Sequence, residues 1–171
     1  GRTPTAYEVR AYVESKAADK KVKLVERLLD SDSFERQQVT EFLWLLNAGQ
    51  DDGLREYLQN AMAENRPWDR MFRDVMLARG DDAASKGAAG FFKQRIGDLD
   101  RLTNEVAVRF FGINVSCAQC HDHPEVASWK QDHYYGMKSF FNRTFDNGGF
   151  VAERAYGQIS FKTTKGEEKK A

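Results

Sequence analysis

The sequence predicts an all-α fold in a single domain. Apolar residues recur at helical spacing along most of the chain, and the segments end at glycine, proline or short polar residues. A chain of 171 residues can bury one sizeable core, and a second independent core is not expected. The 26 basic and 26 acidic residues cancel, which gives no sign of a nucleic-acid partner. No apolar run approaches the ~20 residues that cross a bilayer, so we expect no membrane insertion of this segment.

The first half of the chain is predicted to contain five helices. Thr5-x-x-Glu8 is a capping box that opens the first helix, which extends to about Glu14. Apolar residues at helical spacing predict the other four around residues 22–29, 39–46, 53–64 and 68–76. Pro67 occupies a natural first helical position, and Gly80 resembles a C-terminal glycine cap of the fifth helix.

The second half contains fewer helices and one change of pattern. Residues 80–90 are small and glycine-rich, which predicts a mobile surface loop. A helix is expected from Asp98 to Phe111, with Gly112 as its stop, and another after Asp132, its expected cap. Alternation over residues 158–163 predicts one short strand, and residues 165–171 are expected to be a frayed tail.

The segment Cys117-Ala118-Gln119-Cys120-His121 has the C-x-x-C-H pattern of covalent haem attachment. One helical turn brings both sulfurs to one edge of the porphyrin, where they form thioethers, and the adjacent histidine binds the iron. Cys117 and Cys120 are the only cysteines in the chain. The pattern therefore predicts one haem c per chain, with His121 as the proximal iron ligand.

Three other interpretations use the same residues. A zinc site could combine Cys117 and Cys120 with two of His121, His123 and His133, but the histidine spacing is too long for the usual helical pair. A redox disulfide would need a strand–helix–strand context, which the pattern lacks. The pair could also be chemically inert.

A haem also needs an apolar pocket, and aromatic side chains are concentrated near the motif. The residues expected to line it are Phe110, Phe111, Trp129, Tyr134, Tyr135, Phe140 and Phe141. Each of them could instead be an ordinary core residue. His123 is expected to contact the haem propionates or a ligand residue rather than the iron.

The sixth iron position has two candidates in the following helix. Met137 and His133 lie four residues apart, which places them on one helix face. A weak or vacant sixth position is the third outcome. Met71 and Met76 are expected to be core residues, because methionine fills irregular gaps in many cores.

The chain resembles the planctomycete cytochrome-like domain over roughly residues 1 to 145. The resemblance rests on the segments 28–34, 54–58, 65–68 and 117–124, together with Trp129, Gln131, Tyr134, Tyr135, Phe140 and Phe141. It implies a haem-binding module of large extracytoplasmic proteins. In that family the positions of His133 and Met137 are commonly acidic and aliphatic, which favours a weak or absent sixth ligand.

Together these observations predict a mono-haem c-type cytochrome domain, comprising residues 1–171 of a larger extracytoplasmic protein. An electron carrier that serves a redox partner protein is expected rather than a catalyst. The alternative is a five-coordinate haem that binds or senses a small ligand or acts on a peroxide-like substrate. A zinc-stabilised structural module is the second alternative.

Overall fold

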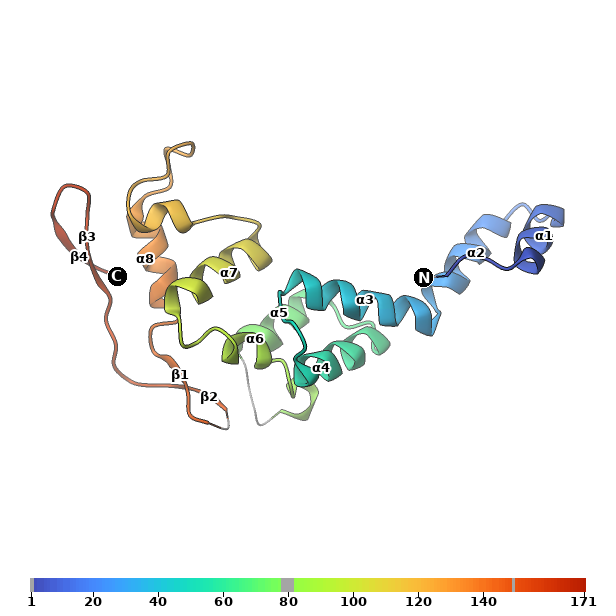
Figure 1. Ribbon diagram of the computed structural model, residues 1–171, viewed down its shortest axis with the longest axis horizontal. Coiled ribbons are helices and arrows are strands. Elements are labelled where there is room, and N and C mark those ends of the chain that lie inside the picture. The colour runs from blue at the N-terminus through green and yellow to red at the C-terminus, as the bar shows by residue number, and fades with distance from the viewer. Residues whose placement is uncertain (1, 78–81, 149) are drawn as a thin grey trace.

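The computed structural model describes residues 2–77, 82–148 and 150–171 (Figure 1). About 53% of these residues are helical, and the strands are short and antiparallel. The prediction of a mostly helical chain is confirmed. Within the described segments, no helix is long and apolar enough to cross a membrane.

The first two helices, α1 (Ala6–Glu14) and α2 (Lys20–Leu29), project from the body of the molecule (Figure 1). The predicted capping box is present: the Glu8 backbone N–H donates to Thr5 Oγ1 at 3.2 Å, and the Thr5 N–H donates to Glu8 Oε2 at 2.7 Å. Neither helix buries a residue, and Val22 and Leu28 are more than half exposed. The helical spacing in α2 therefore marks an amphipathic helix that lies outside the core.

The next three helices form much of the core: α3 (Asp32–Leu45), α4 (Asp52–Ala63) and α5 (Trp68–Leu77). The polar run after α2 also starts α3, because Ser31 Oγ accepts the Phe34 N–H at 3.2 Å. Leu54 and Leu58 of α4 are fully buried. The predicted cap at Gly80 lies outside the described residues.

The structure corrects the mobile loop predicted for residues 80–90 over its described part, residues 82–90. This part forms the short 3₁₀ helix η1 (Ala83–Ser85) and leads into α6 (Gly90–Lys93), with Ala88 fully buried. Gly87 has φ +90°, and a Cβ there would lie 2.0 Å from the carbonyl oxygen of Gly53. The glycine allows the backbone to pack directly against α4. Small residues here permit close packing rather than mobility.

Helices α7 (Leu99–Phe111) and α8 (Gln131–Ser139) frame the predicted site, with the 3₁₀ helix η2 (Ser116–Gln119) between them. The helix predicted from Asp98 is present, with Asp98 as its cap, and Gly112 ends it as predicted, in a left-handed conformation. Asp132 is not the cap of α8: Lys130 holds that position, and Asp132 forms an ion pair with Lys169 at 2.7 Å.

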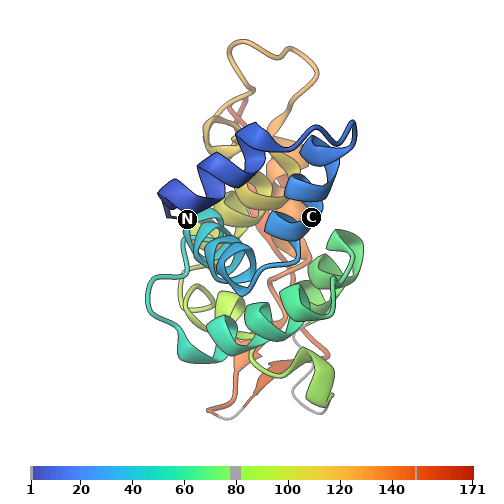
Figure 2. The ribbon, with the colours of Figure 1, turned by 90° about the vertical axis from the view of Figure 1, so that its right-hand side faces the viewer.

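Two hairpins complete the chain. The pairs are β1 (Thr144–Asp146) with β2 (Val151–Glu153), and β3 (Ser160–Lys162) with β4 (Glu168–Lys170). The predicted strand corresponds to β3. The segment predicted to fray contains β4, which pairs with β3 and is tied to α8 through the Lys169–Asp132 ion pair. The hairpin β1–β2 and the loop that follows η2 lie on opposite sides of the molecule (Figure 2).

A buried arginine links three helices in the main core. The Arg95 side chain is fully buried and pairs with Glu105 of α7 at 3.0 Å. Its guanidinium also donates to the carbonyl oxygens of Leu46, Asn47 and Phe91 at 2.7–2.9 Å. Burial lowers the pKa of Arg95 from its ordinary value, and Glu105 opposes that shift. The C-terminal end of α3, helix α6 and the middle of α7 thus meet at one cation.

Candidate functional site

The two cysteines lie on one side of a short turn. Cys117 belongs to η2 and Cys120 caps it, and side chains three residues apart in a 3₁₀ helix point the same way. Both thiols are exposed. Ala118, between them, is buried in a small core with Ala107, Val115 and Tyr134. The turn is therefore anchored on one side and presents both thiols on the other.

His121 is held with its Nε2 atom available for a ligand. Its Nδ1 lies 2.7 Å from the backbone carbonyl oxygen of Asp122. A carbonyl can only accept a hydrogen bond, so Nδ1 carries the proton and donates it. In the neutral ring the Nε2 lone pair is then free, as metal coordination requires.

The other two histidines have the opposite tautomer. His123 Nδ1 accepts the N–H groups of Glu125 and Val126 at 3.2 and 3.1 Å. His133 Nδ1 accepts the Lys130 N–H at 3.0 Å and so caps α8. When neutral, each ring therefore carries its proton on Nε2 and has no lone pair there. Of the three histidines, His121 alone has the tautomer that a ligand at Nε2 needs.

The start of α8 holds the motif from both sides. The Gln119 carbonyl oxygen accepts from Gln131 Nε2 at 3.4 Å and from the Tyr135 hydroxyl at 3.1 Å. Beyond the motif, Asp122 Oδ1 accepts the Gln131 N–H at 3.3 Å and Oδ2 pairs with Lys130 at 2.9 Å. The hydrogen bond from Lys130 holds the pKa of Asp122 below its ordinary value. These contacts fix the backbone on both sides of His121.

Part of the predicted aromatic pocket lies near the motif. Trp129 and Tyr135 pack against the small core, and Trp129 meets His123 edge-on, with ring centroids 5.7 Å apart. Burial raises the pKa of Tyr135, and the neighbouring Asp100 and Cys120 add to that effect. Tyr134 is fully buried, and its hydroxyl donates to Asp100. Burial raises the pKa of Tyr134 as well.

The remaining pocket candidates lie elsewhere. Phe110 belongs with the main core, stacked against Trp68 with ring centroids 5.8 Å apart. Three others, Phe111, Phe140 and Phe141, line a separate cavity whose lining includes none of the motif residues, and the sixth-ligand candidate Met137 lines it too. Met137 also packs against the small core beneath the motif. Among the methionines predicted to be core residues, Met71 is buried, whereas Met76 lines the same cavity.

The described part of the chain contains no cluster of side chains that could form the alternative zinc site. No three histidine, cysteine, aspartate or glutamate side chains there are placed to hold one metal ion. His123 and His133 use their Nδ1 atoms as acceptors for backbone N–H groups. A haem requires only one histidine from this set, together with the two thiols.

Residues 1–146 match PSCyt2, which is described as a protein of unknown function (DUF1549). The chain belongs to the PSCyt2 family. The PSCyt2 match covers the motif, α8 and β1, and nearly coincides with the span of the resemblance found in the sequence. Searches of curated proteins and of solved structures gave no match.

The roles of Asp122 and Gln131 were only partly visible in the PSCyt2 chain's sequence. The Asp122 backbone orients His121, but a backbone carbonyl leaves no residue-type signal. Gln131 belongs to the segment that resembles the family, yet only the fold shows that it joins Gln119 to the backbone N–H of Thr164. It thereby connects the motif to the β3–β4 hairpin.

We expect Gln131→Ala to destabilise the protein by about 1–2 kcal/mol, because Gln131 is buried and its loss leaves the Thr164 N–H without this partner. Urea unfolding of the haem-free chain measures the effect. Gln37→Ala is the matched control, since Gln37 is an exposed helical glutamine whose side chain donates to Glu41 on the same helix. Equal unfolding midpoints for the two variants would contradict a structural role for Gln131.

Proposed function

We propose that the chain is a mono-haem c-type cytochrome domain that carries single electrons. Cys117 and Cys120 would form the thioethers, and His121 would bind the iron through Nε2. The observation that carries the proposal is the His121 tautomer, set by its hydrogen bond to the Asp122 carbonyl. The two thiols on one exposed side of the same turn support it.

The chain's own contribution would be to hold and tune the ligand. Bound haem would supply one-electron chemistry between the ferric and ferrous forms of iron. The Nδ1–H bond to Asp122 fixes the orientation of the His121 ring and increases its basicity as a ligand. Tyr135, Trp129 and the small core provide an apolar side to the motif, which would limit the access of water.

A five-coordinate haem that binds or senses a small ligand, or acts on a peroxide-like substrate, is the second candidate function. It is favoured by the tautomers of the other two histidines, because neither His123 nor His133 has a lone pair on Nε2 for the iron. Among the sixth-ligand candidates this leaves Met137, which is packed between the two cores. The sixth position would then be weakly held or vacant.

The spectrum of the ferric protein tests the sixth position. We expect a high-spin ferric haem that binds cyanide readily, and a ferrous form that binds carbon monoxide. His133→Ala and Met137→Ala should leave the spin state unchanged in absorption and electron paramagnetic resonance. If the unmodified protein is low-spin and one variant converts it to high-spin, that residue is the sixth ligand.

We further propose that this domain works outside the cytoplasm, as part of a larger protein and with a separate redox partner. Covalent haem attachment of this type takes place outside the cytoplasm, so a functional C-x-x-C-H motif requires export. Absorption spectra of the oxidised and reduced protein test the proposal as a whole. A reversible change between two haem spectra supports it, and the lack of any haem absorption would overturn it.

A further inference from the structure

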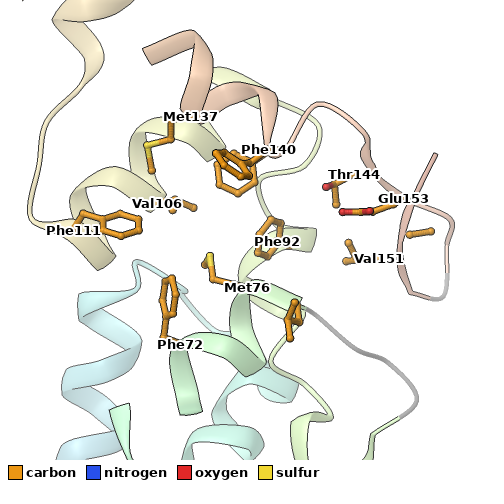
Figure 3. A pocket seen from close by; sticks show the side chains of 13 residues that line it. Phe72, Met76, Phe92, Val106, Phe111, Met137, Phe140, Thr144, Val151 and Glu153 are labelled. Carbon is orange, nitrogen blue, oxygen red and sulfur yellow. The ribbon is translucent and has the colours of Figure 1, made fainter. Parts of the chain in front are cut away.

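A cavity of about 780 Å³ lies where α5, α7, α8 and the β1–β2 hairpin meet (Figure 3). This volume is within the range of small-molecule sites, roughly 300–1,000 Å³. Its walls are almost entirely apolar. They consist of Phe72, Met76, Leu77, Phe92, Val106, Phe111, Met137, Phe140, Phe141, Val151 and Ala152.

This cavity is separate from the motif. None of Cys117, Cys120 and His121 lines it. It borders β1–β2, whereas the loop that follows the motif projects from the opposite side of the molecule (Figures 1 and 2). Several of its aromatic walls remain accessible: Phe140 is 78% exposed and Phe111 is 54% exposed. When an apolar ligand fills an open apolar cavity of this size, apolar surface is removed from water and the free energy falls.

One end of the cavity is polar. Thr144 and Glu153 are directly paired in the β1–β2 ladder, so their side chains lie on the same face of the hairpin. Figure 3 shows the oxygen atoms of both beside each other at the cavity wall. Among the described residues, no ion pair to Glu153 is formed. The Glu153 carboxylate accepts hydrogen bonds and repels anions, whereas the Thr144 hydroxyl can both accept and donate hydrogen bonds.

We propose that this cavity binds a small molecule with an apolar body and a hydroxyl head group that donates a hydrogen bond to Glu153. The apolar walls determine the body of the ligand, and the single polar end determines its orientation. An anionic head is excluded, because it would lie against the Glu153 carboxylate. The site does not depend on haem at the motif.

Fluorescent probe displacement tests the ligand class. The probe is N-phenyl-1-naphthylamine, which fluoresces in apolar surroundings, and the competitors are para-butylphenol, its methyl ether and para-butylbenzoate. We expect the phenol to bind about fivefold more tightly than its ether, since the ether cannot donate to a charged acceptor. The benzoate should bind most weakly, because its carboxylate would lie against Glu153. Glu153→Gln should remove most of the difference in affinity between the benzoate and the phenol. Equal binding of all three competitors would overturn the proposed head group.

Val151→Trp tests the location, because Val151 lies on the same face of β2 as Glu153 and a larger side chain there would fill the cavity. We expect at least a tenfold loss of probe affinity, whereas Ala155→Trp, an exposed position four residues further on, should change it little. Far-ultraviolet circular dichroism shows whether each variant is folded. Unchanged affinity in a folded Val151→Trp variant would overturn the site. So would binding by the haem-free chain and not by the haem-loaded one, because the cavity would then belong to the haem.

Discussion

Protein made in a host that attaches haem c should keep its colour after denaturation and acid extraction, with one haem per chain. The reason is covalent: thioethers from Cys117 and Cys120 survive conditions that release a haem held only by its iron ligand and by packing. Mass spectrometry of the denatured chain measures the attachment directly.

Variants separate the three roles within the motif. Cys117→Ala or Cys120→Ala should weaken attachment, and the double variant should leave haem fully extractable. His121→Ala should keep the covalent bonds and change the iron spectrum, since it removes the ligand and leaves both thiols. Ser116→Ala is the control, an exposed residue in the same turn that should not alter attachment. Colourless protein with stoichiometric zinc would instead establish the zinc-stabilised module.

Arg95→Ala should cost about 3–5 kcal/mol of folding free energy, the largest stability effect that we expect from one substitution in this chain. It removes a fully buried cation and leaves Glu105 without its closest partner. It also removes the shared donor of three backbone carbonyls, two at the end of α3 and one in α6. Denaturant unfolding of the haem-free chain gives the free-energy difference.

A second arginine that pairs with Glu105 provides the control for that substitution. Arg101 also pairs with Glu105, at 3.4 Å, but its side chain is about half exposed. Arg101→Ala should therefore change the unfolding free energy by about 0–1 kcal/mol. If the two arginine variants lose similar stability, the buried network around Arg95 does not hold the helices together as the structure implies.

Local signals were predictable from the sequence, and long-range packing was not. The capping box at Thr5 and the start and stop of α7 at Asp98 and Gly112 depend only on residues within a few positions, and all were predicted. The packing of Gly87 against Gly53 joins segments more than thirty residues apart, so composition alone suggested a loop. The helix at residues 22–29 was predicted from local spacing, but only the fold shows that α2 lies outside the core.

The site divides in the same way. The thiols and His121 follow from one pentapeptide, whereas the His121 tautomer depends on how the chain turns at Asp122. Phe110 and Phe111 are neighbours in sequence and equally close to the motif. About 100° of helical rotation separates them, which directs one into the main core and the other to the cavity. Distance along the chain therefore could not identify the residues around the motif.

The family match ends inside a hairpin, which matters for the choice of a fragment to produce. The match stops at Asp146, the last residue of β1, and β2 begins at Val151. A fragment cut at that boundary would lose one strand of a hairpin and an entire wall of the cavity. It would also lose Phe161, whose ring stacks on Tyr135 with centroids 4.0 Å apart. The segment that matches the family is thus shorter than the segment whose residues pack together in the structure, and a fragment designed from the match alone would omit those contacts.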